Sequence, residues 1–158
     1  MLFRSAFYAS EFLSFSNEKI VIKALETIYS LSNNEVNRLV NPMLDVFEHG
    51  SKAQRLLSIK ILGRIKDTQS IILLLQKVET LSAYEKYEIL LMIEGMGLQS
   101  IPALVTVMVE QHFSYSARSI AGRSLGRLAF EQFKDLERQL ILNEIDRKST
   151  RLNSSHRL

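Results

Sequence analysis

The sequence predicts an all-α fold in which pairs of helices repeat along the chain and stack into an α-solenoid. Only two prolines and six glycines occur among the 158 residues, which favours long helices over a turn-rich β fold. Apolar residues recur at spacings of three and four along most of the chain, as on one face of a helix. A motif glycine recurs at Gly63, Gly95 and Gly126, at intervals of 32 and 31 residues, and such periods indicate a repeat array.

Two helices are expected near the start of the chain. Residues 6–15 carry an aromatic and aliphatic face that fits a short helix. Residues 17–31 place Ile20, Ala24 and Ile28 at four-residue spacing, which predicts a second, amphipathic helix.

The next helix should run from Ser32 to about His49. Ser32 and Glu35 have the spacing of a capping box, in which each side chain binds a free amide of the other residue. Pro42 lies inside this helix and should kink or split it. Gly50 is expected to end the helix in the left-handed conformation.

Residues 51–78 form the central helix pair. Ser51 opens another capping box, and Asp67 or Thr68 should cap the second helix of the pair. The five consecutive apolar residues at 71–75 fit a buried strand as well as a buried helix. We expect a helix, because an inner helix between two neighbours is apolar nearly all round.

Two further pairs complete the array. Ser82 opens the third capping box, the glycines of 95–97 should end that helix, and Pro102 fits the first turn of its partner. In the last pair, we expect one helix over 118–128, a turn at 129–130 and a second helix over 131–145. Phe133, Leu136, Leu140 and Ile141 should face inward from this second helix.

The composition excludes several classes of protein. With 46% hydrophobic and 23% charged residues, the chain has an ordinary globular composition. It contains no cysteine, which excludes disulfide scaffolds, cysteine zinc sites and thiol catalysis. No signal-peptide pattern and no apolar run of roughly 20 residues is visible, so we expect a cytoplasmic segment that does not itself enter a membrane.

Both ends of the chain resemble translated sequencing-library adapter. Residues 146–156 match one reading frame of a widely used adapter, and residues 1–5 match the complementary side with a start codon. We therefore expect residues 6–145 to be a HEAT-like domain within a larger protein, with non-native tails at 1–5 and 146–158. The net charge of +3 then lies in the tails, and the near-neutral remainder argues against nucleic-acid binding.

The repeating unit resembles the HEAT repeat, in particular the short bacterial form found in phycobilin lyase-like proteins. The matching residues are Arg55 with Leu62 and Gly63, Arg118 with Leu125 and Gly126, and 101–104, which read Ile-Pro-Ala-Leu. Tyr87 or Glu88 stands where the unit at Gly95 should have its arginine, and Ser30 replaces the first glycine. The resemblance implies a right-handed α-solenoid of about four helix pairs.

The repeat motivates the hypothesis of a scaffold that binds proteins, although HEAT-like arrays have many functions. No constellation of residues in the sequence supports a reaction or a cofactor, so we expect neither. A regulatory segment of a larger bacterial membrane transporter or nucleotide-responsive protein is the alternative, and a bilin lyase-like enzyme is a more distant one. Any binding groove should be lined by polar residues of the second helices. The candidate contacts are Arg38, Asp45, Gln76, Glu110 and Arg138.

Other residues invite a chemical role but have simpler explanations. His49 and His112 lack companions at metal-ligand spacing, so we expect them to be structural or solvated. Ser124 lies within Gly-Arg-Ser-Leu-Gly, but the nucleophile elbow needs a strand before the turn, and helical periodicity surrounds this serine.

Three charged or aromatic sets remain. The glutamates should form a solvated helix face, and the arginines should support a local turn or contact a phosphate or an acidic peptide. The aromatic residues should be packed between units. The sets are Glu85, Glu88 and Glu94; Arg118, Arg123 and Arg127; and Tyr84, Tyr87, Phe113 and Tyr115.

Overall fold

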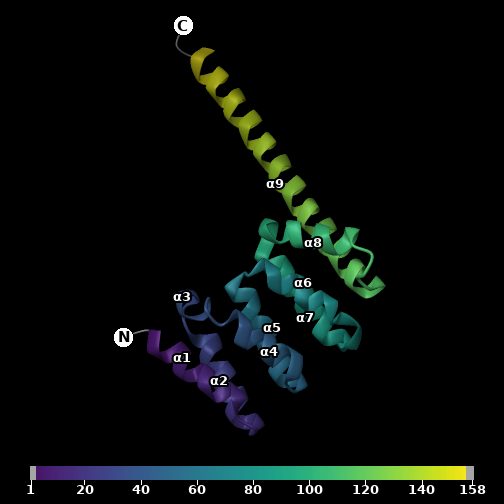
Figure 1. The fold of residues 1–158 in the computed structure, drawn as a ribbon. Helices are drawn as coiled ribbons and strands as arrows, with labels where there is room; N and C mark the ends of the chain where they lie inside the picture. Colours follow the sequence, from purple (N-terminus) through teal and green to yellow (C-terminus); the bar gives the residue numbers. More distant parts are fainter. Residues whose placement is uncertain (1–2, 156–158) are drawn as a thin grey trace.

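The computed structural model describes residues 3–155, and every element in that range is helical, as the sequence predicted (Figure 1). Residues 1–2 and 156–158 of the two adapter-like tails lie outside the described range. The elements are α1 Phe3–Glu11, η1 Phe12–Ser14, α2 Glu18–Ser30, α3 Asn33–Val36, α4 Val40–His49, α5 Lys52–Ile65, α6 Thr68–Gln76, η2 Val78–Thr80, α7 Ala83–Met96, η3 Gly97–Ser100, α8 Ile101–Val109 and α9 Tyr115–Ser155.

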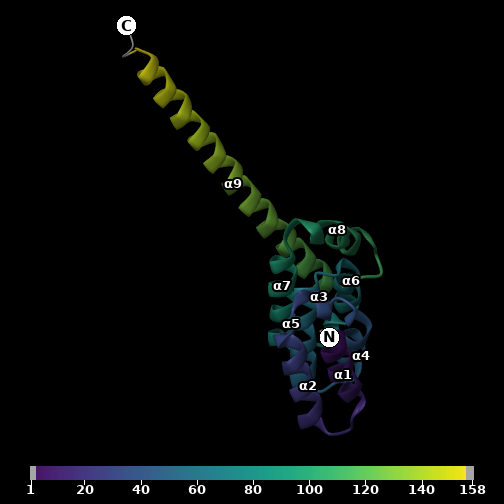
Figure 2. The same ribbon diagram turned by 90° about the vertical axis from the view of Figure 1, so that its left-hand side faces the viewer.

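The helices form two layers that are seen edge-on in Figure 2. The first layer contains α2, α5, α7 and the start of α9, and each of these helices packs against the next. The second layer contains α1, α4, α6 and α8, with α3 joining α2 to α4. Contacts between the layers, such as those of α4 with α5 and of α8 with α9, pack each helix pair against the next pair.

One apolar cluster runs through both layers from α1 to α9. Ile59 of α5, Ile89 of α7 and Leu104 of α8 are fully buried in it. The apolar run at 71–75 is helical, and Ile71 in α6 is also fully buried. Burying a side chain of this size stabilises the fold by about 1.5 to 3 kcal/mol, so the stacking of neighbours supplies most of the stability.

The predicted helix over residues 32–49 is split, as Pro42 indicated. Helix α3 ends at Val36, and α4 begins at Val40, which makes Pro42 the third residue of α4. In this first turn the missing amide of proline costs little, whereas a continuous helix would bring its ring against the carbonyl of Arg38. The break between the two helices removes that clash.

The expected left-handed conformation of Gly50 is wrong. Gly50 is extended, with φ −77° and ψ 165°. Glycine is required at this position for another reason. A Cβ here would collide with the carbonyl oxygen of Val46 and lie 2.9 Å from Oε1 of Gln54. Close approach of the chain, and not a positive φ, therefore requires glycine here.

The expected turn at residues 129–130 is also wrong, because α9 is one continuous helix of 41 residues. No glycine or proline lies between Gly126 and the end of that helix, and the sequence after Leu128 is rich in helix-favouring residues. The second part of α9 projects away from the layers instead of folding back (Figure 1). Accordingly Leu136, which was expected to face inward, is 53% exposed.

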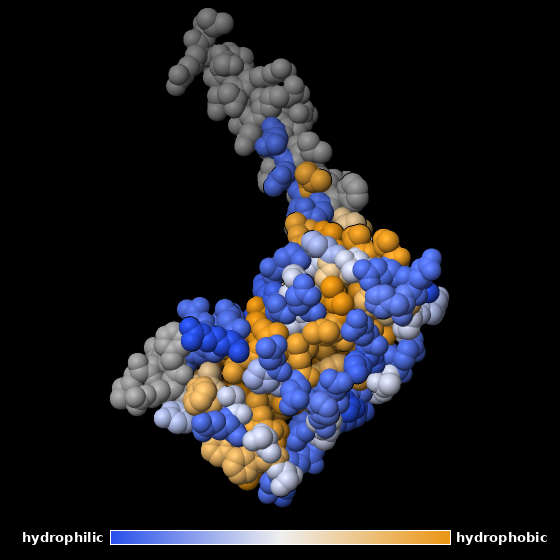
Figure 3. Space-filling view, in the orientation of Figure 1, coloured by the Kyte–Doolittle hydropathy of each residue, from blue (hydrophilic) through white to orange (hydrophobic). Residues whose placement is uncertain are grey.

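The other three predicted inward residues of this helix, Phe133, Leu140 and Ile141, have side chains outside the described part. Because no helix folds back here, apolar surface remains at the base of the projecting part of α9 (Figure 3). Helix α8 exposes Val105, Met108 and Val109 in this region, with Val109 73% exposed.

One stretch, Ala83–Val109, is long and apolar enough by composition to cross a membrane. It is not a single straight helix, because the 3-10 turn Gly97–Ser100 separates α7 from α8 and Gly97 has φ 69°. Within the apolar window, 44% is buried inside the protein. Packing in the core therefore accounts for much of its apolar character.

The motif glycines differ in what surrounds them. A Cβ at Gly63 would lie 2.8 Å from Cγ of Met92, so α5 and α7 approach closely at this point. A Cβ at Gly122 would make ordinary contact with Met108, and those at Gly95 and Gly126 would meet nothing within 4 Å. Of these four glycines, Gly63 alone lies where a side chain would be too close to a neighbouring helix.

The substitution Gly63→Val should lower the free energy of unfolding by about 1 to 3 kcal/mol, because Met92 and the adjacent backbone must shift. The matched substitution Gly126→Ala, in a helix with open space, should raise the free energy of unfolding by up to about 1 kcal/mol. Urea denaturation followed by circular dichroism measures both changes. Equal losses for the two variants would contradict the close packing of α5 on α7.

Candidate interaction surfaces

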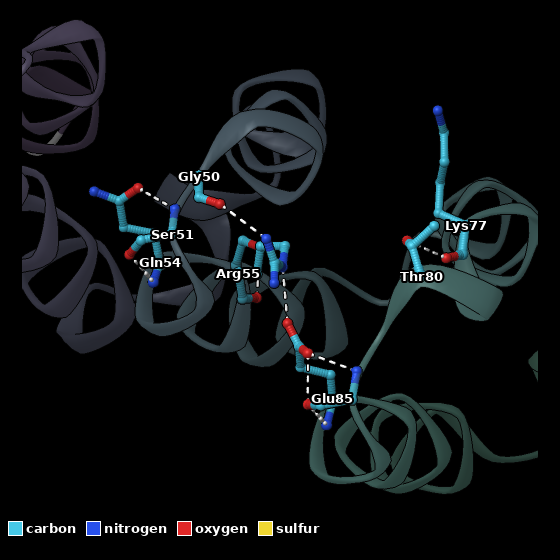
Figure 4. Close-up of polar contacts among 9 residues, drawn as sticks. Gly50, Ser51, Gln54, Arg55, Lys77, Thr80 and Glu85 are labelled. Atoms are coloured by element: carbon cyan, nitrogen blue, oxygen red, sulfur yellow. Dashed lines mark hydrogen bonds and ion pairs between the residues drawn. The ribbon is translucent and has the colours of Figure 1, made fainter.

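A partly buried ion pair joins the central helix pair to the next one. Nε of Arg55 in α5 donates to Oε1 of Glu85 in α7 at 2.8 Å, and Nη1 donates to the carbonyl oxygen of Gly50 at 3.1 Å (Figure 4). The other oxygen of Glu85 accepts from the backbone amide of Ser82 at 2.9 Å and from its hydroxyl at 2.6 Å. One carboxylate therefore both caps α7 and binds the preceding pair.

This environment lowers the pKa of Glu85. Burial acts in the opposite direction, because it disfavours the charged carboxylate, but the hydrogen bonds from Ser82 and the guanidinium of Arg55 outweigh it. The side chain of Glu85 is only 2% exposed, whereas that of Arg55 is 27% exposed. Glu85 thus carries a desolvated negative charge that depends on its partners.

Two arginines that directly follow a motif glycine reach back to the preceding pair. Arg64 donates to the carbonyl oxygen of Leu31 at 2.6 Å and to Oδ1 of Asn33 at 2.9 Å, which fixes the turn between α2 and α3. Nη1 of Arg127 lies 3.0 Å from Oε1 of Glu94 in α7. These contacts were not predicted from the sequence, although the repeated Leu-Gly-Arg marks the two arginines as equivalent positions.

The glutamates of α7 do not form the solvated face that was expected. Glu85 is 1% exposed and Glu88 is 9% exposed, and the side chain of Glu94 is 17% exposed. Oε1 of Glu88 lies 3.7 Å from Nζ of Lys60 on α5. All three carboxylates therefore face basic residues of neighbouring first-layer helices, which favours a role in joining pairs over acid–base chemistry.

The residues that invited a chemical role are dispersed. The side chains of His49 and His112 are 71% and 57% exposed, each next to one carboxylate. Ser124 lies inside α9 and is fully buried, so it is not presented on a turn as a nucleophile. Within the described residues, no group of three or more potential metal ligands comes together.

The predicted contact residues are distributed along the second layer and do not form one cavity. Arg38 lies between α3 and α4, where it lines a groove of about 350 Å³ with Phe7 and Pro42. Asp45 is exposed on α4, Gln76 is exposed at the end of α6, and Glu110 is exposed just after α8. Arg138 lies in the projecting part of α9, and its side chain is outside the described part.

Charge is divided between the layers in a way that the near-neutral total concealed. Among the described side chains, the charged residues within the second-layer helices and α3 are acidic, and those of the first-layer helices are predominantly basic. The acidic residues are Glu11, Glu35, Asp45 and Glu48. Arg38 and Lys77, in the connections that adjoin the second layer, are basic, and Nζ of Lys77 lies 2.7 Å from Oε1 of Glu48. The first layer holds Lys19, Lys23, Lys52, Arg55, Lys60, Arg64, Lys86, Arg118, Arg123 and Arg127 against Glu18, Glu26, Glu85, Glu88 and Glu94.

Two grooves open on the outer surface. One, of about 450 Å³ between α1 and α2, is largely apolar and is lined by Tyr8, Phe12 and Ile20. The other, of about 390 Å³ between α7 and α9, is lined by basic, aromatic and hydroxyl side chains over an apolar floor; we call it the α7–α9 groove. Its residues are Ala83, Lys86, Tyr87, Leu90, Tyr115, Ser116, Ser119, Ile120 and Arg123.

The aromatic residues near unit boundaries do not share one role. Phe113 is 3% exposed and is packed as expected. Tyr84, Tyr87 and Tyr115 are 51%, 52% and 83% exposed, so the expectation of packing is wrong for these three. The hydroxyl group of Tyr84 hydrogen-bonds to the carboxylate of Glu88, which raises the pKa of Tyr84, whereas Tyr87 and Tyr115 line the α7–α9 groove.

In comparisons with known proteins, no protein-family model, no curated protein and no solved structure matches this chain.

Replacing Arg55 by methionine should lower the free energy of unfolding by about 2 to 3 kcal/mol, because the buried carboxylate of Glu85 loses a charged partner. Lys52→Met, one turn earlier on the exposed face of the same helix, should change it by less than about 0.5 kcal/mol. Chemical denaturation at neutral pH measures the difference. Similar small changes in both variants would show that the ion pair contributes little.

The lowered pKa of Glu85 also predicts a pH dependence. A carboxyl group whose pKa is lower in the folded state stabilises the fold above its unfolded pKa of about 4.3, and this contribution is lost as pH falls through the folded pKa. The difference in unfolding free energy between the wild type and Glu85→Gln should therefore be largest near pH 7 and shrink on acidification. A difference that is constant from neutral to acidic pH would contradict this assignment.

Proposed function

We propose that the chain is a right-handed α-solenoid of HEAT-like helix pairs that acts as a scaffold for protein partners and catalyses no reaction. The recurrence of the contact between pairs carries this proposal: Arg64 and Arg127, each after a motif glycine, both bind the preceding pair. Contacts that repeat with the sequence period are the property of an array in which each unit depends on its neighbours.

The distribution of exposed groups supports binding through surfaces. In stacked arrays, function depends on an extended face, because no unit by itself encloses a cavity. Here the two layers present different chemistry, with exposed acidic and amide groups on the second and basic and tyrosine groups on the first. A partner can thus distinguish the two faces by charge as well as by shape.

The state of the titratable groups favours binding over catalysis. General acid–base chemistry needs a carboxyl or imidazole group that can exchange protons with a substrate. The buried carboxylate of Glu85 is committed to Ser82 and Arg55, and the exposed His49 and His112 line neither the groove between α1 and α2 nor the α7–α9 groove. We therefore retain a protein partner, a cytoplasmic setting and no cofactor as parts of the proposal.

Site-specific photo-crosslinking can test the scaffold proposal. A photoreactive amino acid is introduced at exposed Asp45 or Gln76 on the second layer, or at exposed Ser119 on the first, in cells of the organism that carries the gene. We expect discrete adducts with other proteins from at least one face, since a scaffold holds its partners in fixed positions. The same group at fully buried Ile59 is the control.

The pattern of adducts decides the outcome. Protein adducts that depend on position, with none from Ile59, support a scaffold. If no exposed position yields a protein adduct, or if the purified chain converts a substrate without a protein partner, the proposal fails.

A further inference from the structure

We propose that the α7–α9 groove binds a short acidic segment of a partner protein, in which an apolar side chain lies between carboxylates. This inference rests on the proposed scaffold function and assigns the face and the chemistry of one partner. It places that partner on the first layer and not on the second, where the sequence had suggested contacts.

The charges of the groove favour a carboxylate ligand. Lys86 and Arg123 line it from opposite helices, and no acidic side chain lines it. Neither of these residues forms an ion pair within the described part of the chain, in contrast to Lys60 and Arg127 nearby, which face Glu88 and Glu94. The groove is therefore a place on this face where two positive charges from opposite helices are not already balanced by an ion pair.

The carboxylate of Glu79, which interacts electrostatically with Lys86, forms its hydrogen bonds elsewhere. One of its oxygens accepts a hydrogen bond from the backbone amide of Ser116 at 3.4 Å. Hydrogen bonds from the Ser114 and Ser116 side chains hold the pKa of Glu79 below its ordinary value. Glu79 thus closes the amino-terminal end of α9 and leaves Lys86 and Arg123 to an external anion.

The remaining groove residues include both polar and apolar side chains, which suits a ligand in which carboxylates flank an apolar side chain. Tyr87 and Tyr115 are 52% and 83% exposed and can donate their hydroxyl groups to carboxylate oxygens. Leu90 and Ile120 line the same groove and are each 8% exposed, so they offer an apolar floor. Tyrosine and arginine around a small apolar centre are typical of residues that dominate binding energy at protein interfaces.

The same residues disfavour nucleic acid. Affinity for nucleic acid comes from many phosphate contacts along a continuous basic surface. On this face Glu88 and Glu94 interrupt the positive charge on both sides of α7. The volume of about 390 Å³ suits a few side chains and not a strand of successive nucleotides.

Fluorescence anisotropy with a labelled peptide of repeating Asp-Leu-Glu triplets tests the groove. Lys86→Gln and Arg123→Gln should each raise the Kd about tenfold, the loss expected for one charge-assisted hydrogen bond. Lys52→Gln removes the same charge from α5 outside the groove and should change the Kd less than about twofold. Circular dichroism confirms that each variant is folded.

Several results would overturn the assignment. They are the absence of measurable peptide binding, an equal loss of affinity in Lys52→Gln, or tighter binding of a labelled oligothymidylate that Lys86→Gln and Arg123→Gln abolish. The scaffold proposal fails separately: if the peptide does not bind but photo-crosslinks from Asp45 or Gln76 persist, the groove assignment is wrong and the scaffold stands. If the wild type binds the peptide and Lys86→Gln and Arg123→Gln weaken binding as expected, but no exposed position crosslinks in cells, the scaffold proposal fails and the anion site remains.

Discussion

Exclusion of water between α5 and α7 is the condition on which the other contacts of the structure depend. Ile59 and Leu62 on α5 and Ile89 and Ile93 on α7 are completely buried, and neither helix could cover them alone. Once these side chains leave water, the Arg55–Glu85 pair at the edge of the contact is desolvated as well. Its carboxylate must then keep every partner, which explains why one glutamate serves both the cap and the contact between pairs.

The local elements could be predicted because their signals are local. The side chains of the capping residues Ser51, Asp67 and Ser82 accept hydrogen bonds from backbone amides only three residues away, so a short stretch of sequence contains the whole interaction. The prediction of a turn at residues 129–130 was wrong because it did not depend on local signals. It was transferred from the repeat pattern, while the residues at that place favour continuation of the helix.

Long-range features were harder to predict from one sequence. The partners of Arg64 lie more than 30 positions away, and only the fold brings them together. The difference in charge between the two layers was not predicted, because the net charge of the chain adds together helices that face opposite sides. Counting charge separately for first and second helices would have indicated the α7–α9 groove, since Lys86 and Arg123 both belong to first helices.

Among the described side chains, the first-layer helices up to Arg127 carry ten basic and five acidic residues, which gives this face a positive electrostatic field. An approaching acidic protein therefore experiences a torque that turns the first layer toward it before any contact is made. This orientation acts over about one Debye length, roughly 8 to 10 Å at physiological salt, and it weakens as salt is added. The two layers thus influence how fast, and from which side, a partner arrives, in addition to how tightly it is held.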